Sequence, residues 1–433
     1  MRYLISDLHI HSRFSRATSK YLTFPNLYKW ALIKGVYLLG TGDILHPKWL
    51  EEAKEYLVYD QNTGFYSLKP EIAQALAPEI PSKVRGNTMF FVPSVETSHI
   101  YKQDDKLRRI HLVFVLSDLE KAKKLSDKMA TFSTVAADGR PIFGVNARDM
   151  TEIVLEIDPN AIVIPAHIWT PHFSLFGSKS GFDDIKQAFK DMTPYVTCLE
   201  TGLSSDPKMN RLVPDLDKYI LCSNSDSHSL ERIGREANLH TQLDSYTMLK
   251  SALKTGEGLY GTIEFYPQEG KYHYDGHRNC QVSFHPQESQ KHNNICPKCN
   301  KPLTIGVLNR VYQLAKGNTQ LNSKLLEKYK SIYIIPLEDI LASLLGTGRT
   351  SKRVKRAYFD AIETLGSELD ILTTIEPKTI AKYDPLLARA IELLRQDQIV
   401  VEPGYDGEYG KIRIPKEKLE QPSSSQGSQL SLL

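Results

Sequence analysis

The feature that most constrains the fold of this chain is an alternation of short apolar segments with amphipathic segments, which continues to about residue 265. Amphipathic helices are expected at 24–35, 47–57 and 118–132. Strands are expected at 2–6, 36–41, 89–96, 110–116, 161–166, 196–201 and 219–225. Strands that alternate with helices in this way predict a parallel α/β fold, either layered or closed into a barrel.

Side chains that commonly bind metals lie near the ends of most of these expected strands. The first strand runs into the sequence DLHIHS, where His9 and His11 stand two residues apart. Residues i and i+2 of an extended chain point to the same face, so both imidazoles converge on one point. Related residues recur downstream: Asp43, His46, Glu96, His111, His167 and a second i, i+2 pair, Asp226 and His228. Because strand ends share one face of a barrel, we expect a metal site there rather than scattered surface histidines.

This order of motifs resembles the PHP (polymerase and histidinol phosphatase) family of metal-dependent phosphoesterases over roughly residues 1–265. The resemblance implies a distorted (βα)7 barrel with three metal ions, and Asp226, Glu96 and His228 as catalytic side chains. It implies a first ion held by His9, His11, Glu96 and Asp226, a second by Glu96, His111 and His167, and a third by Asp43 and His228. The family more often has histidine where Asp43 stands, and residues 13–17 offer no ligand. We therefore expect a weak or partly vacant third site, with His46 as a substitute ligand.

A cluster of such ions suits the hydrolysis of a phosphoester. Clustered cations lower the pKa of a bound water and neutralise the phosphate oxygens in an in-line displacement. Ligand sets rich in imidazole favour zinc or manganese over magnesium, which remains an alternative at the catalytic sites. The expectation is two or three catalytic ions and no covalent nucleophile.

A separate structural zinc site is expected within residues 266–315. His277 and Cys280 have two residues between them, and Cys296 and Cys299 repeat that spacing after 15 intervening residues. Two such pairs are typical of a closed tetrahedral zinc site, which lets a short segment fold. The odd count of five cysteines favours metal binding in a reducing compartment over disulfides.

Residues 316–410 are expected to form a basic helical domain, with helices at 337–346, 351–366 and 385–396. Residues 278–356 hold 14 lysines and arginines against 4 acidic residues, although the whole chain carries only +3. A basic block on a mildly acidic body indicates a polyanion partner, and cations at a helix start suit a DNA backbone. The expected DNA contacts are Arg349, Lys352, Arg353, Lys355 and Arg356. The alternative is an ordinary solvated helix surface.

Over nearly its whole length the chain resembles the endonuclease Q family, most clearly in TGDILHPKW, PHFSLFGS and GHRNC with CPKC. The resemblance implies a DNA repair endonuclease that cuts 5′ to deaminated bases (hypoxanthine, uracil, xanthine) and abasic sites. An enzyme cannot inspect a base while that base is stacked in the duplex, so it needs a pocket that receives the extruded base. We expect this pocket in the loop 167–182, lined by Trp169, Phe173, Ser174, Phe176 and Gly177. The alternative places these aromatic rings in the core.

Residues 411–433 are expected to be a flexible tail. Its end, Gln429, Leu430, Ser431, Leu432 and Leu433, resembles the Q-L-x-L-F peptide with which bacterial proteins bind the sliding clamp, with Leu433 in place of the aromatic residue. Tethering of the enzyme to the clamp through this tail would raise the local concentration of the enzyme at replicating DNA. The chain contains neither a run of about 18 apolar residues nor a signal-peptide pattern, so a cytoplasmic, nucleoid-associated protein is expected.

Two other enzymatic functions remain open on the sequence alone. One is a PHP phosphatase that acts on a small phosphate monoester, and the other is a PHP nuclease without lesion specificity. A binding module with a decayed metal site is disfavoured, because every expected ligand of the first two ions is present.

Overall fold

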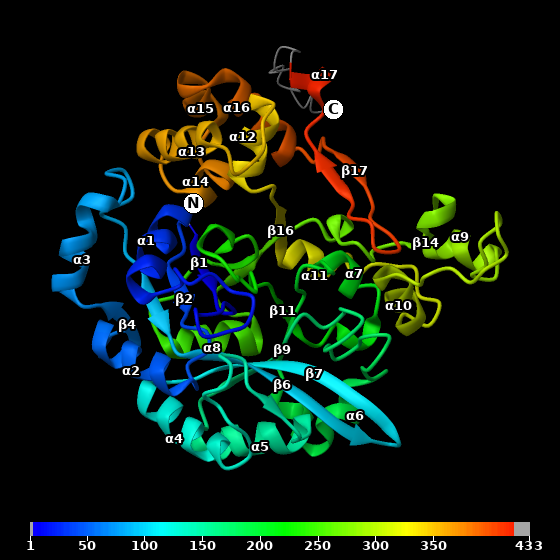
Figure 1. The fold of residues 1–433 in the computed structure, drawn as a ribbon, viewed down its shortest axis with the longest axis horizontal. Helices are drawn as coiled ribbons and strands as arrows, with labels where there is room; N and C mark the ends of the chain where they lie inside the picture. The colour runs from blue at the N-terminus through cyan, green and yellow to red at the C-terminus, as the bar shows by residue number, and fades with distance from the viewer. Residues whose placement is uncertain (1–2, 420–433) are drawn as a thin grey trace, which may run out of the picture.

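The computed structural model describes residues 3–419, and it has the α/β architecture expected from the sequence, with a distorted barrel at its centre (Figure 1). Every strand expected up to residue 225 is present. The central strands are β1 (Leu4–Asp7), β2 (Leu38–Gly40), β5 (Phe90–Val92), β6 (Ser94–Gln103), β7 (Lys106–Val115), β9 (Ile162–Pro165), β10 (Cys198–Glu200), β11 (Ile220–Cys222), β12 (Ala237–His240) and β13 (Leu259–Glu264).

Helices cover the outside of these strands, and local sequence fixes where they begin and end. The principal ones are α1 (Phe24–Lys34), α2 (Pro47–Tyr56), α4 (Leu119–Ala130), α5 (Ala147–Ile157) and α8 (Tyr246–Thr255). Helix α1 has a proline in its first turn and ends at Gly35, whose φ of 90° suits glycine. Helix α4 begins after Asp118, whose carboxylate accepts a hydrogen bond from the backbone N–H of Lys121.

The strands are mixed in direction rather than all parallel. β1, β2 and β5 run parallel, but β12 is antiparallel to β1, and β13 is antiparallel to β12. β6 and β7 form a hairpin that turns at Asp104 and Asp105, both with positive φ. The expectation of parallel strands was wrong here because an apolar run predicts a strand without indicating its direction. A second hairpin, β3 (Leu57–Asp60) and β4 (Phe65–Leu68), extends the other sheet, which contains β1, β2 and β5.

A small module follows the barrel and lies at its side (Figure 1). It contains β14 (Asp275–His277), β15 (Val282–Phe284) and α9 (Pro286–Lys291), and α10 (Val307–Leu314) leads out of it. Its own core is only Val282, Cys296 and Leu303, with Cys280, Phe284 and Cys299 packed against them. So small a core gives little stability by itself, which agrees with a need for a metal.

The C-terminal helices form a group above the barrel in Figure 1. They are α12 (Leu337–Leu345), α13 (Lys352–Leu365), α14 (Glu368–Thr373), α15 (Pro377–Tyr383) and α16 (Pro385–Arg395). Before them, β16 (Lys330–Tyr333) pairs in parallel with β13, so this region also adds a strand to the main sheet. A buried ion pair fixes the helices to the barrel, because Lys34 Nζ lies 2.5 Å from Glu368 Oε2 and both side chains are 3% exposed.

Candidate metal centre

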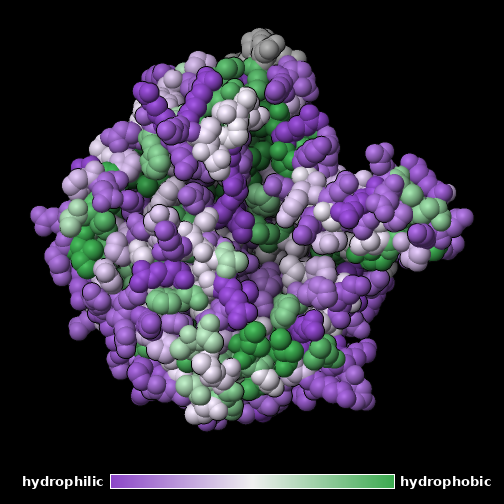
Figure 2. Space-filling model, viewed as in Figure 1, coloured by the Kyte–Doolittle hydropathy of each residue, from purple (hydrophilic) through white to green (hydrophobic). Residues whose placement is uncertain are grey.

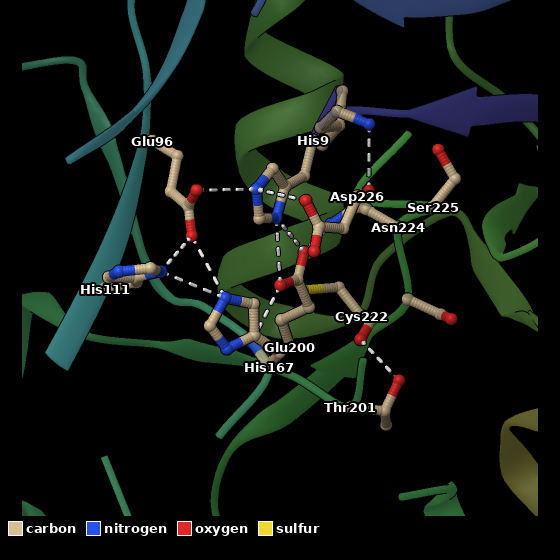
Figure 3. Close-up of polar contacts among 12 residues, drawn as sticks. His9, Glu96, His111, His167, Glu200, Thr201, Cys222, Asn224, Ser225 and Asp226 are labelled. Atoms are coloured by element: carbon tan, nitrogen blue, oxygen red, sulfur yellow. Dashed lines mark hydrogen bonds and ion pairs between the residues drawn. The ribbon is translucent and has the colours of Figure 1, made fainter. Parts of the chain in front are cut away.

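The predicted ligand side chains meet at one side of the barrel although they come from different strands (Figure 3). They are His9 and His11 just after β1, Glu96 on β6, His111 on β7, His167 after β9, and Asp226 after β11. His167 and Asp226 have positive φ angles of 30° and 45°, which are uncommon for residues other than glycine. Such strained backbone is found mainly where a fold holds a side chain for function.

Two groups of possible metal ligands share one carboxylate, that of Glu96. In each group the ligand atoms all lie within 4.8 Å of one another. The first group is His9, His11, Glu96 and Asp226, and the second is Glu96, His111 and His167. These are the two sets that the sequence analysis expected to hold the first and second ions.

The two oxygens of Glu96 face different groups. Oε1 lies 2.5 Å from His111 Nδ1 and 3.0 Å from His167 Nε2. Oε2 lies 3.3 Å from His11 Nε2 and 3.6 Å from His9 Nε2. Figure 3 shows this carboxylate between His9 on one side and His111 and His167 on the other. The geometry is that of a carboxylate able to bridge two ions.

The electrostatics of the centre fit divalent cations. Burial raises the pKa of Glu96, but His111 and His9 outweigh it and hold that pKa well below its usual value. The fully buried His9 Nε2 has no hydrogen-bond partner among the described residues, and it lies 3.6 Å from both Glu96 and Asp226. A buried ring nitrogen of this kind is costly unless it meets a proton or a metal.

Two further carboxylates hold the rings of the first histidine pair. Glu200 lies 3.1 Å from His9 Nδ1 and accepts a hydrogen bond from the backbone N–H of His167 at 2.7 Å. Asp43 lies 3.0 Å from His11 Nδ1. Both acids are fully buried. A carboxylate on the far nitrogen of a histidine fixes the ring so that Nε2 points at the metal position.

The predicted third site is not assembled in the same way. The second carboxylate oxygen of Asp43 accepts hydrogen bonds from the Ser12 backbone and from the Ser12 and Ser15 hydroxyls. Asp43 belongs to neither of the two ligand groups that share Glu96 within residues 3–419. His228 lies over His11 at 4.5 Å between ring centroids and is about one-third exposed. His46 does not replace Asp43, since its Nε2 donates to the Ala136 carbonyl at 3.2 Å.

Two charged groups in this centre, Glu200 and Arg140, were not among the predicted site residues. Glu200 stands at the end of a strand, so the rule that selected the other ligands also applied to it. Arg140 lies on the loop between α4 and β8 (Ile142–Phe143), and its Nη1 is 3.1 Å from Glu96 Oε2. No periodic pattern marks a loop residue, so nothing in the sequence placed Arg140 near Glu96.

A second pair of carboxyl groups lies buried in the sheet next to this centre. The pairing of Ala237 with Ile263 places Glu236, just before β12, opposite Glu264 at the end of β13, and both are fully buried. Burial raises both pKa values well above normal, and repulsion by Glu264 adds to the shift of Glu236 while repulsion by Asp206 adds to that of Glu264. The folded protein therefore keeps these two protons to a higher pH than the unfolded chain does.

Because these pKa values are raised by folding, their stabilising contribution is present at low pH and is lost as pH rises through the folded pKa. We expect Glu236→Gln, which is neutral and of similar shape, to flatten the decline of the melting temperature between pH 6 and pH 9. Differential scanning calorimetry across that range measures it, with the exposed Glu71→Gln as control. An equally steep decline in the Glu236 variant and in wild type would contradict the assignment.

Comparison with known proteins identifies the fold. The family description "MJ0043 C-terminal domain" matches residues 336–398, which include α12 to α16. The protein MJ0043 of Methanocaldococcus jannaschii is 32% identical over 260 residues, which cover 58% of this chain but only 32% of that protein. The chain thus spans about a third of the length of this relative.

Solved structures cover nearly the whole chain. The crystal structure of the lesion-specific endonuclease PfuEndoQ from Pyrococcus furiosus matches with a TM-score of 0.81 and 28% identity, over 98% of both chains. The chain therefore shares the endonuclease Q fold over nearly its whole length. An endonuclease Q structure with a 27-mer duplex that carries an abasic lesion at the active site matches with a TM-score of 0.80 and 28% identity, over 98% of this chain and all of that one.

In the endonuclease Q fold of this chain, the loop 167–182 begins at a metal-centre histidine, as expected. Trp169 and Phe176, however, are 1% and 2% exposed and pack against each other. Ser174 Oγ donates to the His167 carbonyl at 2.7 Å, and Gly177 packs closely on the Thr170 carbonyl. Of the three aromatic rings predicted to line the pocket, that of Phe173 is partly exposed. Its centroid lies 4.9 Å from the ring centroid of His111.

The remaining predicted groups lie on parts of the endonuclease Q fold outside the barrel. The ligand atoms of His277, Cys280, Cys296 and Cys299 all lie within 4.8 Å of one another.

The predicted DNA contacts lie on the C-terminal helices. In the first turns of α13 the exposed side chains are Lys352, Arg353, Lys355 and Arg356, and Arg349 just precedes this helix. The clamp-like peptide Gln429–Leu433 lies outside the described residues. No helix within residues 3–419 is long and apolar enough to cross a membrane.

Proposed function

We propose that this chain is a DNA repair endonuclease that hydrolyses the phosphodiester 5′ to deaminated bases (hypoxanthine, uracil, xanthine) and abasic sites. The observation that carries the proposal is the pair of ligand groups that share Glu96, within a chain that matches endonuclease Q over 98% of its length. The abasic duplex bound to a relative at its active site supports DNA as the substrate.

The residues in place suit two divalent ions, one in each group, and zinc or manganese suits their imidazole-rich composition. Such ions would supply Lewis-acid chemistry, in which they activate water and neutralise charge on the phosphate. Glu200 and Asp43 orient the first two histidines through Nδ1. We assign Asp43 this orienting role in place of a third-ion ligand.

Two side chains at the open side of the centre are assigned to the substrate. The Nδ1–H of His228 donates to the Asp226 carbonyl at 2.9 Å, so its Nε2 is the nitrogen that can meet the departing oxygen. Phe173 is assigned to the lesion as the exposed ring of its loop. A structural zinc ion is assigned to the group His277, Cys280, Cys296 and Cys299.

The DNA duplex is assigned to the side that carries the basic helix and the zinc-binding module. Figure 2 shows a notch in the molecular outline between the C-terminal helices above and this module at the right, with hydrophilic side chains on both rims. The last five residues are proposed to bind the sliding clamp, and a cytoplasmic, nucleoid-associated location follows from these partners.

A duplex labelled at its 5′ end and carrying one deoxyinosine tests the proposed function. We expect one cut, 5′ to the lesion, that disappears in the variant Asp226→Ala. Deoxyuridine and abasic duplexes should be cut at the corresponding bond. Equal degradation of an undamaged duplex would overturn lesion specificity, and hydrolysis of a small phosphate monoester alone would favour a phosphatase.

The cations of α13 should set the salt dependence of DNA binding. Because each neutralised phosphate contributes about 0.9 to the slope of log K against log salt, the triple variant Lys352→Ala, Arg353→Ala, Arg356→Ala should lower that slope by roughly 2 to 3. Lesion and undamaged duplexes should lose affinity equally in fluorescence anisotropy. The matched triple Lys123→Ala, Lys124→Ala, Lys128→Ala on α4 removes the same charge, and an equal effect there would refute a specific contact.

A further inference from the structure

Arg140 is a cation placed inside a centre that is built to hold cations. Its Nη1 donates to Glu96 Oε2 at 3.1 Å, on the side of the carboxylate that faces His9 and His11. About one-third of its side chain is exposed, whereas Glu96 is fully buried. Arg140 therefore reaches the shared carboxylate from the open side of the centre.

The backbone of Arg140 is fixed by contacts on both sides. Gly139 donates its N–H to the Phe14 carbonyl at 3.0 Å, and a Cβ at this glycine would stand 2.3 Å from an oxygen of Asp43. Beyond Arg140, the Pro141 carbonyl accepts from the Ser98 N–H, and β8 then pairs with β6, the strand of Glu96. These contacts hold the loop so that the side chain of Arg140 lies beside Glu96.

The position of Arg140 has a consequence when ions occupy the two groups. An ion held by His9, His11, Asp226 and Glu96 would take the same carboxylate oxygen that the guanidinium now contacts. The two cations compete for Glu96 Oε2, and the flexible side chain is the one that can turn away. The nearest suitable anion would then be the phosphate of a bound substrate, to which a guanidinium can donate two parallel hydrogen bonds.

We propose that Arg140 binds a non-bridging oxygen of the scissile phosphate and stabilises the charge that develops there during hydrolysis. This inference rests on the proposed phosphodiester chemistry, but it does not depend on which lesion is recognised. Arg140 adds a donor that is fixed to the protein, and it contributes most when the phosphate geometry changes in the transition state.

The test compares wild type with Arg140→Ala and Arg140→Lys on two substrates, the deoxyinosine duplex and bis(4-nitrophenyl) phosphate. We expect the single-turnover rate of Arg140→Ala to fall by about 10²- to 10³-fold on the duplex, with partial recovery in Arg140→Lys. The rate on the small diester should fall in the same direction. Arg148→Ala on α5, whose partners are Asp191 and Glu152, is the matched control and should match wild type.

The affinity for Mn²⁺, measured by electron paramagnetic resonance of the free ion, separates substrate contact from a structural role. Removal of a competing cation from Glu96 should leave Mn²⁺ affinity unchanged or tighter. A loss of Mn²⁺ affinity that parallels the loss of rate would overturn the proposal, as would an Arg140→Ala rate within about threefold of wild type. Wild type that hydrolyses the small diester but does not cut the lesion duplex would refute the proposed function and leave the Arg140 assignment standing on that diester.

Discussion

Glu96→Gln is expected to slow cleavage of a lesion duplex by about 10³-fold and to remove tightly bound metal from both ligand groups. The carboxylate is common to the two groups, so one change of an oxygen to an amide weakens both. A loss of about 4 kcal/mol of charge stabilisation in the transition state, within the range for metal catalysis, corresponds to a rate about 10³-fold lower. Single-turnover cleavage and metal analysis of the dialysed protein measure the two effects.

The control for Glu96 is Glu120→Gln on α4, a glutamate that is 78% exposed and pairs only with Lys54. It should keep both the metal content and the rate of wild type. Circular dichroism should show that the Glu96 variant is folded. If Glu96→Gln kept its full catalytic metal content and cleaved at the rate of wild type, the shared carboxylate would have no catalytic role.

Loss of Cys296, a proposed zinc ligand, is expected to unfold the small module while the barrel remains folded. Cys296 is fully buried and belongs to a core with only two other buried side chains, Val282 and Leu303. Structural zinc sites contribute about 10 to 16 kcal/mol of apparent binding free energy, more than a core of this size can replace. Cys296→Ser should therefore lose one zinc ion and become sensitive to limited proteolysis within residues 266–315.

The control for this prediction is Cys198→Ala, which alters a buried cysteine on β10 outside the zinc group. It should retain the zinc ion of the module and its resistance to protease. The module also contacts the loop between β17 (Val400–Glu402) and β18 (Lys411–Arg413), where Asp406 accepts from Thr304 at 2.6 Å. Lesion binding should weaken with the module's unfolding, and a Cys296→Ser protein that stayed protease-resistant without zinc would contradict a structural metal.

The sequence allowed much of the candidate site to be located because its residues follow a simple rule. His9, His11, His167 and Asp226 lie just after the C-terminal ends of strands, and such ends meet on one side of a barrel. Glu96 follows β5 and lies near the start of β6. The clustering of these side chains follows from the order of strands alone. Their distances do not, because the antiparallel hairpin of β6 and β7 was not readable from apolar runs.

Other features depended on packing that a sequence does not display. Asp43 follows a strand and has a carboxylate that could bind a metal ion, yet this carboxylate is already hydrogen-bonded to His11 and two serines. Trp169 and Phe176 have aromatic rings that could stack on a base, but both rings are buried in the core. Arg140 comes from a loop whose conformation depends on contacts with Phe14 and Ser98, far away in the sequence.

The central claim is that Glu96 joins two cation sites in one centre. An anomalous difference map from crystals grown with Mn²⁺, recorded near the manganese absorption edge, tests it directly. Two peaks are expected, one among His9, His11, Glu96 and Asp226, and one among Glu96, His111 and His167. A map with manganese elsewhere in the crystal but no peak beside Glu96 would contradict the account.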